Sequence, residues 1–183
     1  MAKGALMSIH HAPAARPSVE LVAASVLDIP FIFGLLQEGS TTGVFSDRYL
    51  SSAGIWRSFR SIALACVRNA VRRRRVEGLW LIRGEDADHG FAWVQRTPDE
   101  QEVYCIDMIS LDQQARGKGL GTAAVMALQQ KIGPQASLIA LCTPYAKTMR
   151  ALLRGSGFKR NKQSLVVPDS NHGIDLYHWR HAA

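Results

Sequence analysis

The sequence predicts an α/β (α+β) domain built on one sheet of mixed direction. The chain has 183 residues, 47% of them hydrophobic, which is enough to bury one sizeable core and short for two ordinary domains. Its strand-like and helix-like segments follow the order β-α-α-β-β-β-α-β-α-β-β, which suits neither an all-helical nor an all-strand fold. A glycine-rich turn joins the fourth strand to the third helix, and that junction is typical of a phosphate site.

The N-terminal segment is expected to differ from the rest. Residues 1–18 mix Ala, Pro and His without a hydrophobic period, so they cannot bury enough surface to hold themselves in place. We therefore expect a disordered tail at 1–18 and a single domain at 19–181.

The first half of this domain is expected to contain two helices and a hairpin. Asp28 and Pro30 are a good N-cap and first-turn pair for the first helix. The elements expected are a strand at 19–24, a helix through Gln37, a Gly/Ser/Thr-rich loop at 39–43, a basic amphipathic helix at 55–72, and hairpin strands at 79–83 and 90–95. The apolar face expected on the second helix consists of Ile55, Phe59, Ile62, Ala63, Cys66, Val67 and Ala70.

The second half carries the glycine-rich turn. Val103 to Leu111 predicts an apolar strand interrupted by one acid, Asp107. The remaining expected elements are a helix at 122–131 closed by Gly133-Pro134, a buried strand at 137–142, a helix at 145–154, and a final hairpin with strands at 164–167 and 174–179.

Charge and cysteine content limit the function classes. The net charge is +7, with a cluster at Arg72–Arg75 that could attract nucleic acid, although a solvated helix end is the favoured interpretation. The three cysteines are odd in number and far apart, so we expect neither disulfides nor a metal site. No segment suits a signal peptide or a membrane span, so we expect a soluble, cytoplasmic protein.

The glycine-rich turn is the strongest functional signal. Three glycines alternate with other residues between Gln114 and Thr122, so backbone N–H groups can converge where no Cβ blocks them. Arg116 and Lys118 add positive charge, and the helix dipole adds more. A P-loop would need Lys then Ser or Thr after its last glycine, and a dinucleotide fold would place its glycines after the first strand. A tight turn without a ligand remains the alternative.

The segment Gln114-Ala115-Arg116-Gly117-Lys118-Gly119 resembles the acetyl-CoA motif Q/R-x-x-G-x-G/A of the GNAT superfamily of N-acetyltransferases, and the pattern also fits when shifted by two residues. Ser156-Gly157-Phe158 resembles that family's G-F step, and the element order matches over essentially the whole domain. The resemblance implies a mixed, mostly antiparallel sheet of about six to seven strands, flanked by about four helices and splayed between the fourth and fifth strands.

The resemblance also implies a co-substrate site for acetyl-CoA. Amides around the turn would bind the diphosphate, and the pantetheine arm would lie along the fourth strand. The cofactor-binding residues it implies are Ile109, Leu111, Gln114, Arg116, Gly117, Lys118, Gly119, Leu120, Gly121 and Thr122. The slot between the splayed strands would be lined by Asp107, Met108, Ile109 and the segment from Leu141 to Thr143.

Three residues are catalytic candidates. A lysine-type amine has a pKa of about 10.4 and attacks only when neutral, so the site must help remove a proton. Asp107 is the first candidate base, because a buried acid in an apolar strand has a raised pKa, and Glu102 is the second. A purely structural role for Asp107 is an equal alternative. Tyr145 could supply a phenol to the leaving thiolate, or it could simply pack.

The chain departs from the family pattern at two positions. Leu153 stands where many members have a tyrosine that protonates the thiolate, and Ala146 stands where an asparagine is common. Cys142 has no evident histidine partner and is interpreted as a core residue.

These features leave several functions open. The first is acetyl transfer to a primary amine of a small molecule or protein. The alternatives are a non-catalytic acyl-CoA-binding module, an acetyltransferase of aminoacyl-tRNA, and an RNA-binding protein; a homodimer is possible.

Overall fold

A computed structural model describes residues 17–42, 45, 52–71, 76–98, 102–165 and 174–181. The expected tail, except for its last two residues, and the Arg72–Arg75 cluster lie outside the described residues. Within the described ranges, no helix combines the length and the hydropathy needed to cross a membrane.

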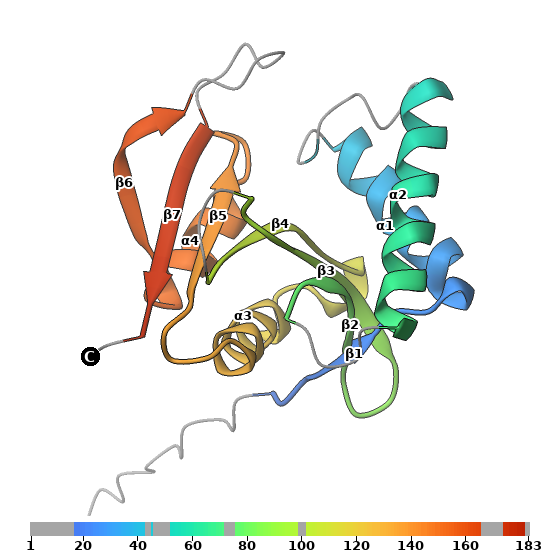
Figure 1. Cartoon of the computed structure of the whole chain (residues 1–183), viewed down its shortest axis with the longest axis horizontal. Coiled ribbons are helices and arrows are strands. Elements are labelled where there is room, and N and C mark those ends of the chain that lie inside the picture. Colours follow the sequence, from blue (N-terminus) through green and yellow to red (C-terminus); the bar gives the residue numbers. More distant parts are fainter. Residues whose placement is uncertain are drawn as a thin grey trace, which may run out of the picture.

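The described residues form one seven-stranded sheet in the order β1-β2-β3-β4-β5-β7-β6 (Figure 1). All neighbouring strands are antiparallel except the parallel pair β4–β5, which confirms the mixed, mostly antiparallel sheet. The strands are β1 Glu20–Ala23, β2 Gly78–Arg83, β3 Asp88–Arg96, β4 Val103–Leu111, β5 Ser137–Cys142, β6 Lys159–Leu165 and β7 Ile174–Arg180.

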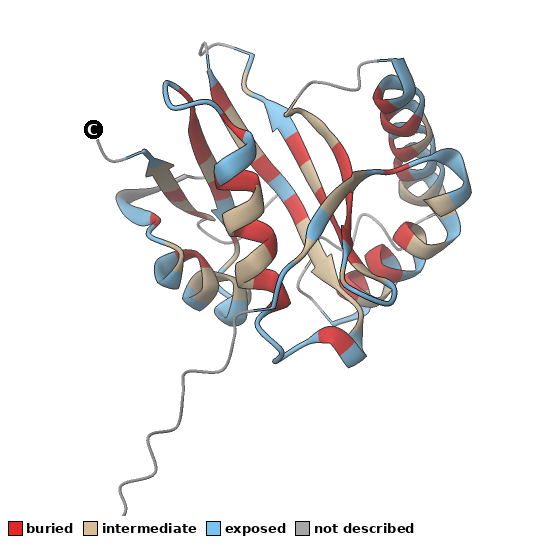
Figure 2. Ribbon diagram, turned by 90° about the horizontal axis from the view of Figure 1, so that it is seen from below, coloured by how far each residue is buried: buried red, intermediate tan, exposed pale blue. Residues whose placement is uncertain are grey.

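In the part of the chain that the structure describes, four α-helices cover the two faces of this sheet. The helices are α1 Ile29–Thr41, α2 Ser52–Val71, α3 Leu120–Lys131 and α4 Lys147–Gly155. Helices α1 and α2 share one hydrophobic core with Leu79 and Leu81 of β2. Helices α3 and α4 share the other with Trp80 and Ile82, because successive side chains of a strand point to opposite faces. Figure 2 shows the buried side of each helix turned toward the sheet.

Helix α1 is longer than the sequence predicts. The expected loop at 39–43 is wrong for its first three residues, which continue the helix to Thr41. Gly39 is buried against the ring of Phe45, which occupies the place a Cβ would take. Ser40 is also buried and donates its hydroxyl to the Leu36 carbonyl at 2.9 Å. Tertiary packing therefore outweighs the low helix propensity of these small residues.

Helix α2 buries a different face from the expected one. Phe59 and Val67 are 42% and 53% exposed, and Ala70 is exposed as well, so the assignment of these three residues to the buried face is wrong. The buried face instead contains Ser58, Ile62, Ala65, Cys66 and Asn69. The Asn69 amide donates to the Leu79 carbonyl at 2.6 Å and to the Ala24 carbonyl at 3.2 Å. These bonds satisfy buried backbone groups, so a polar residue determines the orientation of the helix.

Several boundaries also shift. Strand β6 begins at Lys159, five residues before the expected start, because Lys159 and Arg160 pair with His178 and Tyr177 of β7. It is an edge strand with a polar sequence, so it shows no alternation of apolar residues. Helices α3 and α4 begin at Leu120 and Lys147 instead of 122 and 145.

The parallel strands β4 and β5 separate after four paired residues. Their pairing runs from Val103 with Ser137 to Ile106 with Ala140, whereas β4 continues to Leu111. The register of β3 against β4 also shifts here, because Val94 pairs with Ile106 and Trp93 with Met108. The extra residue between them makes a β-bulge, which bends a strand. The splay expected between the fourth and fifth strands is therefore confirmed.

Candidate functional site

The glycine-rich turn adopts a backbone that only glycine takes easily. Gly117 and Gly119 have φ angles of 76° and 81°, both in the left-handed region, and Gly119 is the N-cap of α3. A residue with a Cβ pays about 1–2 kcal/mol in that conformation. Two left-handed residues separated by Lys118 turn the chain sharply into the helix.

This turn leaves the first amides of α3 directed out of the helix end. The first intrahelical bond runs from the Ala123 N–H to the Gly119 carbonyl at 3.0 Å. The N–H groups of Leu120, Gly121 and Thr122 come before it and have no acceptor within the helix. Such amides, together with the helix dipole, favour an anion at this position.

Gly121 has a packing role as well. A Cβ at this position would lie 2.7 Å from Cδ1 of Leu152 and 3.5 Å from Cδ1 of Leu111. The absence of a side chain therefore lets the start of α3 lie against both α4 and the end of β4.

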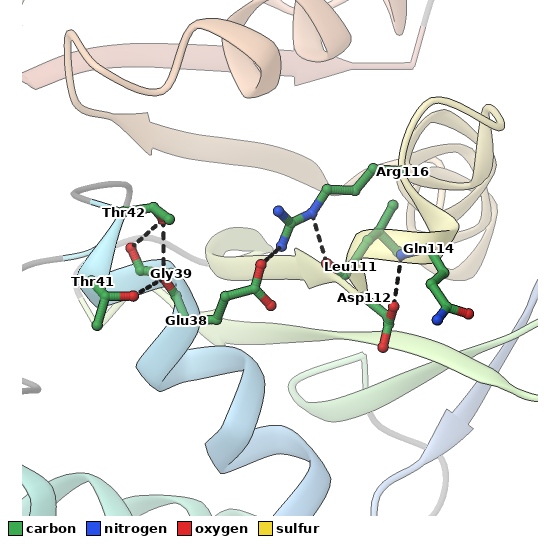
Figure 3. A network of polar contacts seen from close by, with 8 residues as sticks. All are labelled: Glu38, Gly39, Thr41, Thr42, Leu111, Asp112, Gln114 and Arg116. Atoms are coloured by element: carbon green, nitrogen blue, oxygen red, sulfur yellow. Dashed lines mark hydrogen bonds and ion pairs between the residues drawn. The ribbon is translucent and has the colours of Figure 1, made fainter.

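Arg116 is held by a partner that the sequence does not reveal. Its Nη2 lies 2.7 Å from Oε1 of Glu38 at the end of α1, and its Nε donates to the Leu111 carbonyl at 3.0 Å (Figure 3). Both charged side chains are partly exposed. Glu38 reduces the positive charge that the sequence assigned to Arg116 at the mouth of the turn. No local pattern could have indicated this contact, because the partners are 78 residues apart.

The 3-10 turn before the glycines has its own cap. The Asp112 carboxylate accepts from the backbone N–H of Gln114 at 2.8 Å, while the Gln114 side chain is exposed. The sequence prediction missed Asp112, although an acid directly after a strand end is a usual capping signal. Lys118 is also exposed beside the turn.

Beyond the splay, β4 offers a backbone edge to a ligand. Ile109 and Leu111 pair with Ala92 and Gly90 of β3 on one side. On the side of β5, the described ladder has already ended at Ile106. Backbone groups on that edge can bind an extended amide-containing chain as an added strand would.

Asp107 is the bulged residue at the splay point. The sequence led us to expect a buried carboxyl, and this is wrong, because Asp107 is exposed. Its Oδ2 accepts a hydrogen bond from the Gln95 amide at 3.1 Å. The bulge is what turns this side chain away from the core, since its neighbours Ile106 and Met108 are both buried.

A cleft of about 700 Å³ opens beside Asp107, between α2 and the strands β3 and β4. Its size suits a small molecule or the end of a larger one. The polar and charged side chains that line it are Arg57, Ser58, Ser61, Arg68, Asn69, Glu77, Gln95, Arg96 and Asp107.

The structure does not bring the other two catalytic candidates to this cleft. Glu102 has a φ of 62°, is exposed, and lies in the turn before β4, at the opposite end of that strand from the splay. Its carbonyl accepts from the Ser137 N–H at 2.9 Å. Tyr145 is 61% exposed between β5 and α4 and does not line the cleft.

Thr143, the residue directly after β5, has a side-chain hydroxyl whose hydrogen bonding is unsatisfied in the described structure. Among the described atoms, Thr143 Oγ1 is buried and accepts or donates no hydrogen bond. A buried polar atom in this state is costly unless a ligand or water satisfies it. Thr143 belongs to the slot predicted from the sequence.

Neither Cys142 nor Leu153 suits a catalytic role: the first is a poor nucleophile and the second has no proton to donate. Burial raises the pKa of the Cys142 thiol to about 11, with Arg150 lowering it and Asp175 raising it, so the thiol is neutral at neutral pH. Leu153 is fully buried in the core shared by α3 and α4. Cys66, Cys105 and Cys142 are free, and no cluster of three metal-binding side chains occurs within the described ranges.

Comparison with known proteins finds similar structures but no match by sequence. No protein-family model matches the sequence, and no curated protein matches it. The fold is similar to RimL, a ribosomal L7/L12 alpha-N-protein acetyltransferase in complex with coenzyme A (TM-score 0.69, 16% identity, covering 92% of this chain and 96% of that one).

Two further solved structures are comparable. The microcin C7 self-immunity acetyltransferase MccE, in complex with acetyl-CoA and AMP, gives a TM-score of 0.68 at 14% identity and covers 90% of this chain and 93% of its own. A GNAT-family acetyltransferase from Streptococcus agalactiae gives 0.65 at 16% identity, covering 90% and 96%. The chain therefore has the fold of the GNAT acetyltransferases.

Proposed function

We propose that the protein transfers an acetyl group from acetyl-CoA to a primary amine. One observation carries this proposal: the left-handed glycine turn follows the same C-terminal end of β4 at which that strand separates from β5. The N-terminus of α3, which can bind phosphate, then adjoins the part of β4 that has no partner strand on the side of β5. A long ligand that contains both a diphosphate and amide groups requires such an arrangement. The similar structures of RimL and MccE hold coenzyme A and acetyl-CoA, respectively.

The described residues fit such a ligand. The amides of Leu120, Gly121 and Thr122 would hold the diphosphate. The edge of β4 at Ile109 and Leu111 would hold the pantetheine amides, and the orphaned Thr143 hydroxyl would gain a hydrogen-bond partner. The thioester supplies the acetyl group in an activated form.

Asp107 is the group we assign to the acceptor amine. Its carboxylate faces the cleft at the splay and is oriented by Gln95. It would attract the ammonium form of the substrate and take a proton, directly or through water, so that the neutral amine can attack. The amine nitrogen then bonds to the acetyl carbon, the carbon–sulfur bond breaks, and the electron pair leaves on the sulfur.

The leaving thiolate needs no assigned donor. Leu153 has no proton to give, and a thiol pKa of about 8.5 makes the thiolate a tolerable leaving group at neutral pH. Tyr145 remains a candidate donor on the loop after β5. If Tyr145 donates that proton, the Tyr145→Phe variant loses turnover at neutral pH, where a phenol is protonated, while retaining its affinity for acetyl-CoA.

Calorimetric titration with acetyl-CoA tests the binding part of the proposal. We expect micromolar binding by the wild type and its loss in Gly119→Glu, which places a carboxylate in the turn. Release of free thiol with a panel of primary amines then tests transfer. No binding by the folded wild type would refute the proposal. Binding without turnover on any amine would favour the non-catalytic alternative, which the leucine at position 153, where the family commonly has a tyrosine, supports.

A further inference from the structure

The cleft beside Asp107 has a positively charged wall that the transfer chemistry does not require. Arg57 and Arg68 line it from α2, and Arg96 lines it from β3. Ser61 and Leu64 lie between the two α2 arginines and line the cleft as well. The spacing of these four residues places them on one side of a helix, over about three turns or about 16 Å.

Neither α2 arginine is neutralised by an acid that the structure describes. Both side chains are exposed, and the ion pairs formed among the described residues involve other arginines. Among the residues that the structure describes, two acids, Glu77 and Asp107, line the cleft, against three arginines. With Asp107 engaged by the amine, the remaining wall has an excess of positive charge.

We infer that the acceptor amine carries an anionic group, a carboxylate or a phosphate, which Arg57 and Arg68 bind while the amine reaches Asp107. This inference rests on the proposed function, because Asp107 is the amine-binding group in both. Guanidinium groups bind carboxylates and phosphates through paired N–H donors. A polyamine or an additional lysine side chain would instead place a cation against these arginines, which is unfavourable.

The same helix provides a matched control. Arg60 is exposed on α2, between Arg57 and Arg68 in the sequence, but it does not line the cleft. Substituting an arginine that is merely exposed to solvent should have as little effect on substrate preference as substituting Arg60. Substituting an arginine that binds the substrate should reduce the preference.

The test uses acceptors that differ only in their anion. O-phosphoethanolamine is compared with ethanolamine, and β-alanine with its amide, each with acetyl-CoA and detection of free thiol. In the wild type we expect kcat/KM to be about 10- to 100-fold higher for the anionic member of at least one pair, the range that a charge-assisted hydrogen bond provides. The pair that responds identifies phosphate or carboxylate as the anion.

Variants of the α2 arginines show whether these residues cause the preference for anionic acceptors. In the double variant Arg57→Gln/Arg68→Gln the preference should fall to within about threefold of unity, whereas Arg60→Gln should keep it; acetyl-CoA titration reports that each variant is folded. Equal or faster turnover of the uncharged members by the wild type would overturn the inference, as would a preference that survives the double variant.

A failure of the proposed function can be told apart from a failure of this inference. If no amine is acetylated, O-phosphoethanolamine and β-alanine are titrated onto the protein by calorimetry. Binding that the double variant loses supports the anion site although the reaction assignment is wrong. Absence of binding overturns the anion site.

Discussion

Gly119 has a left-handed backbone and lies directly before α3. Substituting it with alanine, which adds a single methyl group, therefore tests whether the turn binds phosphate. We expect Gly119→Ala to weaken acetyl-CoA binding by at least about tenfold, because the Cβ destabilises a φ of 81° and the amides no longer converge. Gly133→Ala is the matched control, since its Cβ would meet nothing within 4 Å and its φ is not left-handed. Equal acetyl-CoA affinities for the two variants in calorimetry would contradict a phosphate site at this turn.

Asp107 and Glu102 are separated in the structure, which makes them a useful pair of variants. Asp107→Asn should reduce kcat/KM for the best amine by about 10²- to 10⁴-fold, the usual effect of removing a general base, with unchanged acetyl-CoA affinity. Glu102→Gln should stay within about twofold, because Glu102 lies at the far end of β4. A large loss in Glu102→Gln with little loss in Asp107→Asn would reverse the assignment.

Glu38 is expected to restrain Arg116. In Glu38→Gln the ion pair at 2.7 Å is removed, and the guanidinium is free to turn toward a bound phosphate. We expect acetyl-CoA affinity to rise about threefold at low salt, with the gain disappearing at high salt as charges are screened. Stability should change by less than about 1 kcal/mol, because the pair is partly exposed. Weaker binding would show that the pair itself shapes the site.

At the scale of elements, α2 is fixed to the sheet through Asn69. Its amide bonds to the carbonyls of Ala24 and Leu79 tie the helix to β2 and to the residue after β1. Asn69→Leu should lower the free energy of unfolding by about 2–3 kcal/mol, since buried backbone groups are left without partners. The exposed Val71→Ala should change it by less than about 0.5 kcal/mol. Urea denaturation measures both, and equal effects would exclude a special role for Asn69.

The β4–β5 splay is the element-scale feature that makes a site possible. The bulge at Asp107 shifts the register with β3 by one residue, and the pairing with β5 ends at the preceding residue. The segment from Asp107 to Leu111 therefore exposes a backbone edge on the side of β5 and carries the carboxylate that lines the cleft. The backbone edge proposed for acetyl-CoA and the cleft proposed for the acceptor amine therefore adjoin on one strand, β4.

For the whole molecule, buried thiols predict loss of stability at alkaline pH. Burial raises the pKa of Cys66 from 9.0 to about 11, with Asp28 adding to the rise. In the unfolded chain the thiol loses its proton first, so the unfolded state is favoured progressively as pH rises from about 9 to about 11. Urea unfolding at several pH values should show this decline. In Cys66→Ala the decline should be shallower, and an unchanged slope would contradict the assignment.

The sequence alone determined those features of the fold that depend on residues close together in the chain. The bounds of β4 and β5, the order of the elements and the glycine turn were predicted correctly, because hydrophobic periodicity and glycine conformation are local properties. The predicted tail and the Arg72–Arg75 cluster lie outside the described residues, and a nucleic-acid partner, a homodimer and a cytoplasmic location stay predictions.

Only the tertiary structure decided which distant residues meet. It placed Asp107 on an exposed bulge at a cleft, moved Glu102 away from it, paired Arg116 with Glu38, and turned α2 so that Asn69 is buried and Phe59 is exposed. Each of these results depends on contacts across strands or between helices. A contact between residues 45 or 78 positions apart leaves no periodic signal in the chain, so the fold could be predicted while the acceptor side of the site could not.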